Sequence, residues 1–192
     1  ALLSQYVHPV ADKLGNGAPV GSGKGIFPLA RVLRYFRCSE NLVLKADAEF
    51  AERFGRGYGG ILEKYRCADA EMYIVAFGAM CGTIREAVDQ MRDKGLPIGL
   101  LKIKLFRPFP VETVKQAVAG VPRLVVMERN YSPGLGGILH QELKAALCGM
   151  ENTPLIHGYL AGVGGVNVST DRIEELARKA LAESPVTQSV WV

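Results

Sequence analysis

The amino-acid sequence predicts an α/β fold, a three-layer α/β/α sandwich with a mostly parallel sheet. Short apolar runs of strand length alternate with amphipathic helical stretches, and the connections between them are short. Parallel strands need a crossover connection, usually a helix, and such crossovers are nearly always right-handed. Helices that connect strands in this way cover the faces of the sheet. We therefore expect one α/β domain whose strand-to-helix loops gather at the carboxyl edge of the sheet.

Residues 1–46 are predicted to form an N-terminal arm or linker with one or two short helices. Gly, Pro and Ser are frequent up to about residue 25, helical spacing follows over 26–37, and residues 40–54 are weakly helical. Glycines after residue 54 then break the chain. We place the compact α/β domain at residues 47–183.

Within that domain, strands and helices alternate in a regular order. Thr83 and Glu86 stand at capping-box spacing, Gly95 and Pro97 end the helix that they open, and Pro110 suits a first helical position. The expected strands lie at 72–78, 98–105, 124–127 and 155–160, and the expected helices follow Thr83, span 111–118 and 138–147, and begin at Ser169, Thr170 or Asp171.

The last helix is expected to end before Pro185, and residues 184–192 form a tail. The tail contains the only tryptophan of the chain, Trp191. Apolar tails of this kind often dock on a neighbouring surface.

The composition is that of a globular protein and excludes several classes of function. Of 192 residues, 48% are apolar and 22% are charged, with a formal net charge of +4. There is no basic stripe with interleaved aromatic residues, so nucleic acid is not an expected partner. No apolar run approaches the roughly 20 residues that a membrane span needs, and no signal peptide is predicted. The four cysteines are isolated from one another, which fits neither zinc nor iron–sulfur ligation and predicts reduced thiols in the cytoplasm.

The stretch from Leu124 to Gly137 is central to the predicted fold. It reads as a buried β-branched strand, a polar turn and a glycine-rich entry into the helix at 138–147, with Gly149 at the C-terminal cap. Its loop belongs to the edge where open α/β domains bind ligands.

Four strand-to-helix turns, at 78–82, 106–110, 129–137 and 162–169, are expected to meet at this edge. One interpretation is a phosphate or acyl-carrier site made of backbone amides and arginines. The other is that the glycines only permit tight turns while the arginines face water or a partner. No catalytic or metal-binding residue is predicted. The candidate cofactor-binding residues are Arg107, Arg129, Asn130, Gly134, Gly136, Gly137, Gly164 and Gly165.

Three glycine-rich stretches resemble nucleotide-binding motifs, but each lacks a residue that the motif requires. The glycines at 134–139 and 162–167 lack the third glycine of the dinucleotide motif, and neither follows the first strand of a βαβαβ unit. In the stretch 18–25, Gly25 replaces the Ser or Thr of a phosphate-binding loop. The three histidines are far apart in the sequence and are expected to be structural or solvated: His8, His140 and His157.

Several motifs together resemble one family. The most specific is the turn Phe106-Arg107-Pro108-Phe109-Pro110 after a buried strand. The sequence resembles the second domain of the α subunit or segment of pyruvate:ferredoxin oxidoreductase, among the thiamine-diphosphate-dependent 2-oxoacid:ferredoxin oxidoreductases, over about residues 47–183. That domain is similar in fold to the C-terminal domain of transketolase. The other motifs that carry the resemblance lie at 48–56, 58–59, 65–66, 69–71, 82–83, 99–105, 128–131 and 162–165.

The resemblance implies a part in the conversion of pyruvate and coenzyme A to acetyl-CoA and CO2, with electrons passed to ferredoxin. It implies thiamine diphosphate, Mg, [4Fe–4S] clusters and coenzyme A for the complex, held by other domains or subunits and not by this chain alone. The implied partners are thiamine-binding and iron–sulfur chains, with ferredoxin indirectly. This chain would then be a non-catalytic assembly domain. It departs from the family in its last glycine loop, where Val166-Asn167 replace an expected Arg-Asp pair.

Two alternatives remain open at this point. One is a free-standing nucleotide-binding or flavodoxin-like module, against which the missing third glycines count. The other is the C-terminal domain of a transketolase or of a 2-oxoacid dehydrogenase β subunit, which shares the fold. Iron–sulfur partner chains would favour the oxidoreductase, and lipoyl-bearing chains the dehydrogenase.

Overall fold

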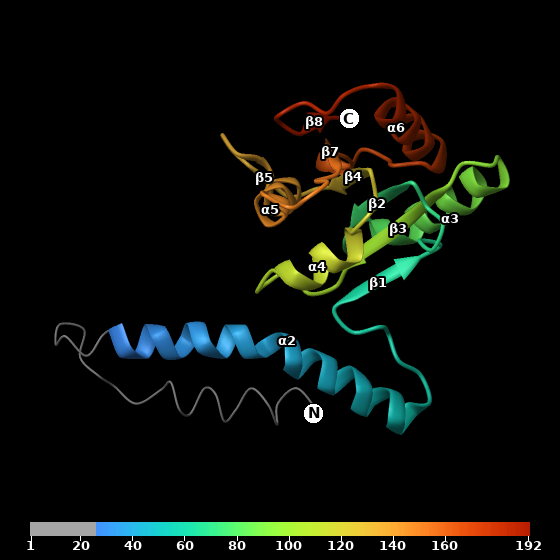
Figure 1. Ribbon diagram of the computed structural model, residues 1–192. Helices are drawn as coiled ribbons and strands as arrows, with labels where there is room; N and C mark the ends of the chain where they lie inside the picture. Colours follow the sequence, from blue (N-terminus) through green and yellow to red (C-terminus); the bar gives the residue numbers. More distant parts are fainter. Residues whose placement is uncertain (1–25) are drawn as a thin grey trace.

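The computed structural model describes residues 26–192, with side chains described from residue 39 onward. A six-stranded sheet forms its centre (Figure 1). Its strands, in order across the sheet, are β1 (Leu62–Tyr65), β3 (Ile98–Ile103), β2 (Met72–Ala76), β4 (Arg123–Glu128), β7 (Leu155–Leu160) and β8 (Val190–Trp191). The pairs that join β3, β2, β4, β7 and β8 are all parallel. Within this sheet of the described residues, only β1 is antiparallel to its neighbour, and β5 (Tyr131–Ser132) and β6 (Gly136–Gly137) form a separate antiparallel hairpin. The predicted α/β fold with a mostly parallel sheet is therefore confirmed. The helices are α2 (Ile26–Phe54), α3 (Met80–Asp93), α4 (Val111–Val118), α5 (Ile138–Leu147) and α6 (Thr170–Ala182). The short hairpin strands β5 and β6 precede α5, and a 3-10 turn (Val163–Gly165) follows β7.

Helices cover both faces of the sheet and bury one apolar cluster on each. On one face, α3 and α6 bury residues such as Ile84 and Ile173 against strand residues such as Ile74. On the other face, α4 and α5 bury Val114 and Leu143. Because the central strands are covered on both sides, they are continuous apolar runs, as parallel strands in this position should be.

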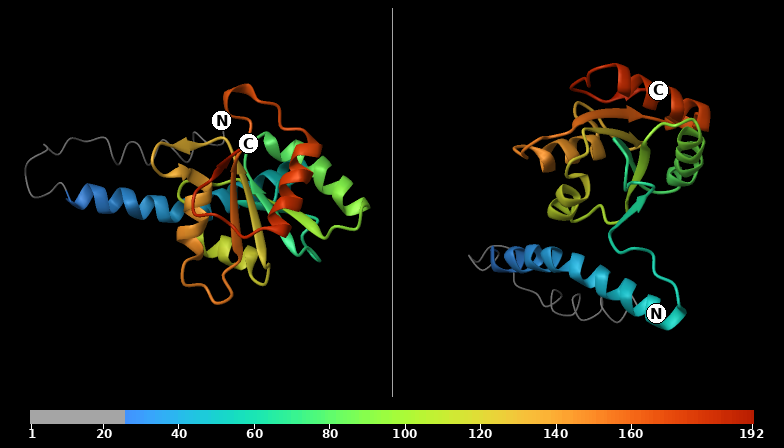
Figure 2. Two further views of the ribbon diagram at one scale, coloured as in Figure 1. Left: turned by 90° about the horizontal axis from the view of Figure 1, so that it is seen from above. Right: turned by 45° about the vertical axis from the view of Figure 1, so that its right-hand side comes forward.

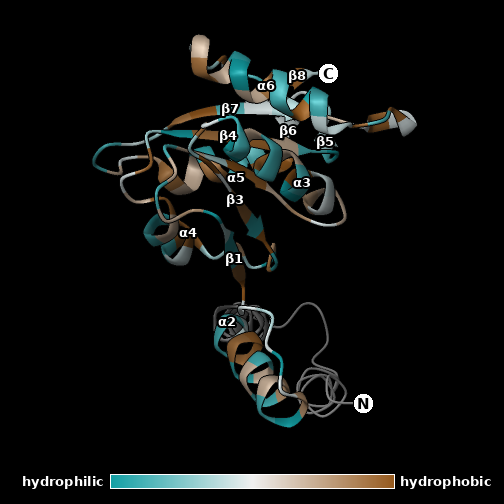
Figure 3. Ribbon diagram, turned by 90° about the vertical axis from the view of Figure 1, so that its right-hand side faces the viewer, coloured by the Kyte–Doolittle hydropathy of each residue, from teal (hydrophilic) through white to brown (hydrophobic). Residues whose placement is uncertain are grey.

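Helix α2 is one continuous helix of 29 residues, where the sequence predicted one or two short helices. Pro28 lies in its first turn, where a missing amide costs little, so nothing in 26–54 interrupts the helix. The helix ends at Phe54, and Gly55 follows with a φ of 68°, so the predicted glycine break is confirmed. The expected boundary between residues 46 and 47 falls inside α2, which lies apart from the layers in Figures 1 and 3. Residues 1–25, including the arm, the motif at 18–25 and His8, lie outside the described residues.

Helix α3 begins earlier than its capping signal predicted. Its first residue is Met80, and its N-cap position, Ala79, makes no side-chain capping bond. Thr83 is therefore inside the helix, and the capping-box prediction was wrong. The last helix agrees better with its signal, because the Ser169 side chain accepts a bond from the Arg172 amide and so caps the helix that begins at Thr170.

The C-terminal tail joins the sheet of its own chain. Strand β8 pairs in parallel with β7, with Leu160 opposite Trp191, and the Val192 amide donates to the Leu160 carbonyl at 3.1 Å. Strand β8 therefore forms one edge of the sheet, while β1 forms the other.

Within residues 26–192, no helix is both long and apolar enough to cross a membrane. The same residues contain no group of three or more His, Cys, Asp or Glu side chains placed to hold a metal ion.

Candidate functional site

The carboxyl edge of the sheet is formed by the turns that follow β2, β3, β4 and β7. The hairpin β5–β6 and the loop after β7 lie at the same end of the domain as the C-terminus (Figure 2). Glu128, the last residue of β4, is the centre of this edge.

Glu128 caps the helix that follows its own strand. Its side chain is 3% exposed, Oε2 accepts a bond from the Leu139 amide at 2.8 Å, and Oε1 accepts one from the His140 amide at 2.8 Å. Burial raises the pKa of this carboxyl group, while the amide hydrogen bonds from Leu139, His140 and Ile138 oppose the rise. A carboxylate at a helix N-terminus occupies the position that an external anion would take.

A serine from the tail completes the cluster. Ser189 Oγ accepts a bond from the Gly137 amide at 3.0 Å and lies 2.9 Å from His140 Nδ1. A Cβ atom on Gly137 would lie 2.4 Å from Glu128 Oε1 and 2.7 Å from Ser189 Oγ, so only glycine fits this approach. The tail is thus tied to the start of α5.

His140 is fully buried on the first turn of α5. Burial, followed by the charge of Lys144, lowers its pKa to about 4, so the ring is neutral at pH 7. Its Nε2 is the only buried side-chain polar atom among residues 39–192 with no hydrogen-bond partner. Gly158 makes room for the ring, because a Cβ there would lie 2.2 Å from His140 Nδ1. These contacts describe a packed, structural histidine.

His157 also makes contacts of a structural kind. Its Nε2 lies 3.4 Å from a nitrogen of Arg123, which also donates to the Ala180 carbonyl at the end of α6 at 2.7 Å. Burial, with the Arg123 charge second, lowers the pKa of His157.

The backbone amides proposed for an anion are largely used within the chain. The Leu135 amide donates to the Ser132 carbonyl at 3.0 Å, and the Ile138 amide donates to the Asn130 carbonyl at 3.2 Å. Gly134 and Gly136 have φ values of 83° and 93°, which a tight hairpin turn requires. Together with the bonds to Glu128 and Ser189, these contacts weigh against the phosphate interpretation and favour glycines that serve the turn.

The two candidate arginines differ in their surroundings. Arg107 donates to Glu142 at 2.6 Å and lies over the Phe106 ring, 4.1 Å from its centre. Arg129 is exposed and has no hydrogen-bond or ion-pair partner in the described part of the chain. Its side chain lies against Gly162, where a Cβ would be 2.8 Å from Arg129 Nε. Of the candidate side chains, Arg129 is therefore the one with a charge available to another molecule.

The remaining candidates lie on exposed backbone. Gly164 and Gly165 lie in the turn after β7, with φ values of 71° and 87°. Among the described residues, neither forms a hydrogen bond with Glu128. Asn130 is exposed, and its carbonyl serves the start of α5.

An aromatic pair at this edge was not predicted. The rings of Tyr131 and Trp191 lie 4.8 Å apart between their centres, although the two residues are far apart in the sequence. The pairing depends on the docking of the tail beside β7, which no local pattern in the sequence indicates. The only signal was that Trp191 belongs to an apolar tail.

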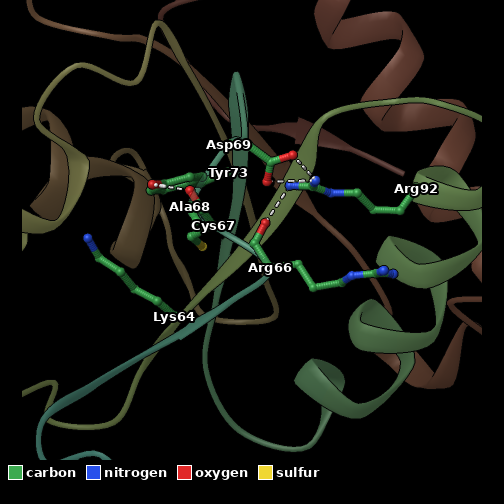
Figure 4. A pocket seen from close by; sticks show the side chains of 7 residues that line it. All are labelled: Lys64, Arg66, Cys67, Ala68, Asp69, Tyr73 and Arg92. Carbon is green, nitrogen blue, oxygen red and sulfur yellow. Dashed lines mark hydrogen bonds and ion pairs between the residues drawn. The ribbon is translucent and has the colours of Figure 1, made fainter.

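A pocket of about 690 Å³ lies at the opposite, amino edge of the sheet (Figure 4). Both carboxylate oxygens of Asp69 accept bonds from Arg92, at 2.8 and 2.7 Å, and the Tyr73 hydroxyl donates to the Cys67 carbonyl at 3.0 Å. Burial raises the pKa of the Cys67 thiol, which favours the unreactive neutral form. None of the predicted site residues lines this pocket. The lining residues are Lys64, Arg66, Cys67, Ala68, Asp69, Tyr73 and Arg92.

The structure is an α/β domain in which the polar residues at the carboxyl edge, Glu128 and Ser189, bind the start of α5 in the same chain. Comparison with known families is consistent with this class. The model of the family "Pyruvate:ferredoxin oxidoreductase core domain II" matches residues 70–173, and the chain belongs to this family.

Individual relatives agree with the family. The chain is 40% identical over 154 residues to pyruvate synthase subunit PorA of Methanothermobacter thermautotrophicus, which covers 80% of this chain and 38% of the relative. It is 34% identical over 201 residues to PorA of Pyrococcus abyssi, covering 99% of this chain and 50% of the relative. It is also 34% identical over 139 residues to ketoisovalerate oxidoreductase subunit VorA of the same organism, covering 72% of this chain and 35% of the relative. The chain thus spans half or less of the length of these relatives.

A solved structure supports the fold. The 2-oxoglutarate:ferredoxin oxidoreductase of Magnetococcus marinus matches 69% of this chain and 21% of its own, with a TM-score of 0.51 and 20% sequence identity.

Proposed function

We propose that this chain is a non-catalytic structural domain of a thiamine-diphosphate-dependent pyruvate (2-oxoacid):ferredoxin oxidoreductase. The complex converts pyruvate and coenzyme A to acetyl-CoA and CO2 and passes electrons to ferredoxin. The observation that carries the proposal is the family match over residues 70–173, which includes the whole carboxyl edge except the tail. The internal use of Glu128 and His140 supports a structural role for this edge.

In this proposal, thiamine diphosphate, Mg, [4Fe–4S] clusters and coenzyme A are held by other domains or chains of the complex. Partner chains that bind thiamine or carry iron–sulfur clusters pack against this domain, and ferredoxin is reached through them. The free cysteines Cys67, Cys81 and Cys148 fit a reducing compartment, so we place the complex in the cytoplasm. Residues 1–46 and 47–183 remain our proposed division of the chain, with 184–192 as a tail that the sheet extends into.

Identification of the chains that bind this one tests the proposal. An affinity-tagged copy is produced in the source organism, the complex is purified, and its chains are identified by mass spectrometry. Iron–sulfur and thiamine-binding chains in fixed stoichiometry are the expected result. Lipoyl-bearing chains would instead assign the domain to a dehydrogenase β subunit.

The nucleotide-binding alternative is tested on the isolated chain. Isothermal titration with NAD, FMN, ATP and coenzyme A is expected to give no tight binding, because the amides at the start of α5 already have partners. Tight binding of any of the four would overturn the assignment as a purely structural domain.

A further inference from the structure

Four exposed apolar side chains lie on the segments that form the carboxyl edge, where Arg129 is also exposed. These four side chains are 42–56% exposed. They come from three segments that are distant in the sequence: the β5–β6 hairpin, the loop after β7, and β8. The left view of Figure 2 shows these segments at the same end of the domain. We call the set the aromatic edge: Tyr131 (42%), Leu135 (51%), Val166 (56%) and Trp191 (55%).

We propose that the aromatic edge, with Arg129 beside it, is the surface that docks this domain on an acidic protein chain of the oxidoreductase. This inference rests on the proposed function, because it names the surface through which that function is carried out. The occupant is a protein surface with an apolar recess for the Trp191 and Tyr131 rings and a carboxylate for Arg129.

The backbone that carries Trp191 is held in place before any partner binds, and its ring lies against that of Tyr131. Trp191 is fixed by the pairing of β8 with β7 and by the bond from the Val192 amide to Leu160. The preceding residues are tied to α5 by Ser189 Oγ and by Lys144 Nζ, which donates to the Thr187 carbonyl at 2.7 Å. A side chain that is already ordered loses little conformational entropy on binding, so a pre-organised surface binds more tightly.

The composition of the edge is that of a binding surface. Trp, Tyr and Arg are the residues most enriched at the energetic centres of protein interfaces. Contiguous exposed apolar area, rather than apolar residues scattered singly, marks interaction surfaces in soluble proteins. The pairing of Tyr131 with Trp191 joins two exposed aromatic residues into one contact area.

Charge selects an acidic partner. The nearest acidic residue in sequence, Glu128, is buried and turned inward onto α5, so it does not neutralise Arg129. Arg129 has no ion pair among the described side chains, while Arg107 already has Glu142. A guanidinium group at the border of an apolar contact favours a carboxylate on the opposing chain.

Substitutions in the chain, recombined with the chains that co-purify with it, test the inference. We expect Trp191→Ala to weaken association at least about ten-fold, as the loss of a central interface residue does. Arg129→Glu should weaken it more than Arg129→Ala, and added salt should reduce the difference. Leu181→Ala is the matched control, because Leu181 is 42% exposed but lies on α6. Native mass spectrometry at several chain concentrations measures the affinities.

The results separate the two proposals. If the wild-type chain binds no oxidoreductase chain, the proposed function fails. If the wild type assembles and the Trp191 and Arg129 variants assemble equally well, the inference alone is overturned.

A second measurement stays informative if a variant is misfolded. Trp191 is the only tryptophan, so a 5-fluorotryptophan label gives one ¹⁹F resonance in this chain. Unlabelled partner chains should shift and broaden that resonance as the complex forms. An unmoved resonance in an assembled complex would contradict the inference. A shift produced by coenzyme A or ATP alone would also contradict it, because it would make the edge a nucleotide site.

Discussion

Glu128 Oε1 accepts a hydrogen bond from the backbone amide of His140 at 2.8 Å, so the last residue of β4 caps the helix that follows it. The second oxygen accepts the Leu139 amide in the same way. An edge that in many α/β domains binds an external anion is therefore filled by a carboxylate of the chain itself.

Removal of this cap should destabilise the domain. Glu128→Ala leaves two buried amides without acceptors, and each costs roughly 1–3 kcal/mol, so we expect a loss of about 3 kcal/mol in the free energy of unfolding. Glu128→Gln keeps one acceptor and should lose less. Urea unfolding followed by circular dichroism gives both values, and the exposed Glu151→Ala is the control. Equal stability of the Glu128 and Glu151 variants would show that the cap contributes nothing.

The buried His140 should make the domain less stable in mild acid. Its pKa is about 4 in the folded chain, against 6.5 for an unperturbed histidine, so between these values the unfolded chain binds a proton that the folded chain does not. Stability is then fully present above about pH 6.5 and falls as the pH decreases towards 4. From pH 7 to pH 5 we expect a loss of about 2 kcal/mol from this residue. The lowered pKa of His157 acts in the same direction.

His140→Gln removes the titrating group and should make this fall smaller, leaving the lowered pKa of His157 and the raised pKa of Glu128 to act in opposite directions. The measurement is the free energy of unfolding in urea at pH 7, 6 and 5 for both chains. A wild-type domain whose stability is unchanged between pH 7 and 5 would contradict the burial of a neutral His140.

Two glycine substitutions should have opposite effects. Gly158→Ala places a Cβ within 2.2–2.7 Å of the buried His140 ring, so it should cost at least about 2 kcal/mol by overpacking. Gly82→Ala lies inside α3 with nothing within 4 Å of the added Cβ, so it should stabilise the domain by about 0.5–1 kcal/mol. Thermal unfolding of the two variants, measured side by side, checks the order. A Gly158→Ala chain as stable as Gly82→Ala would mean that the ring does not lie against Gly158.

Asp47 should control how α2 meets the rest of the chain. Its two oxygens accept bonds from the Tyr58 amide at 3.1 Å and the Gly60 amide at 2.9 Å, which ties the glycine-rich segment back onto the helix. In Asp47→Ala we expect faster hydrogen exchange at these two amides and little change in the global unfolding of the sandwich. Glu52→Ala, on an exposed position of α2, is the control. Unchanged exchange at Tyr58 and Gly60 would show that Asp47 does not hold the segment.

The sequence predicted the elements whose signals are local. The strand at 155–160 and the helices at 111–118 and 138–147 have the expected bounds, because apolar spacing and flanking glycines define them. Strand β1 was missed because Leu62–Tyr65 is short and half charged, and its only support is pairing with β3. The β5–β6 hairpin was missed for a similar reason, since each strand has two residues.

The site depended more on contacts between distant residues. The sequence correctly predicted that the turns lie at the carboxyl edge of the sheet. It did not predict the role of Glu128, because that role requires the carboxylate at the end of β4 to face helix amides that begin eleven residues later. The Tyr131–Trp191 pair likewise requires a tail that returns to β7. The composition of the tail indicated that it is apolar. Only the pairing of β8 with β7 determines that Trp191 lies beside Tyr131.

We propose that this chain assembles the oxidoreductase and performs none of its chemistry. The direct measurement is pyruvate- and coenzyme A-dependent reduction of ferredoxin by partner chains recombined with the wild-type chain, with no added chain, or with the triple variant Arg107→Ala, Arg129→Ala, Asn130→Ala. Turnover is expressed per assembled complex, counted by native mass spectrometry. We predict that omission of the chain abolishes assembly and turnover together, whereas the triple variant keeps kcat per assembled complex within about two-fold of wild type. A fully active complex without the chain, or an assembled triple variant that has lost most of its kcat, would contradict the account.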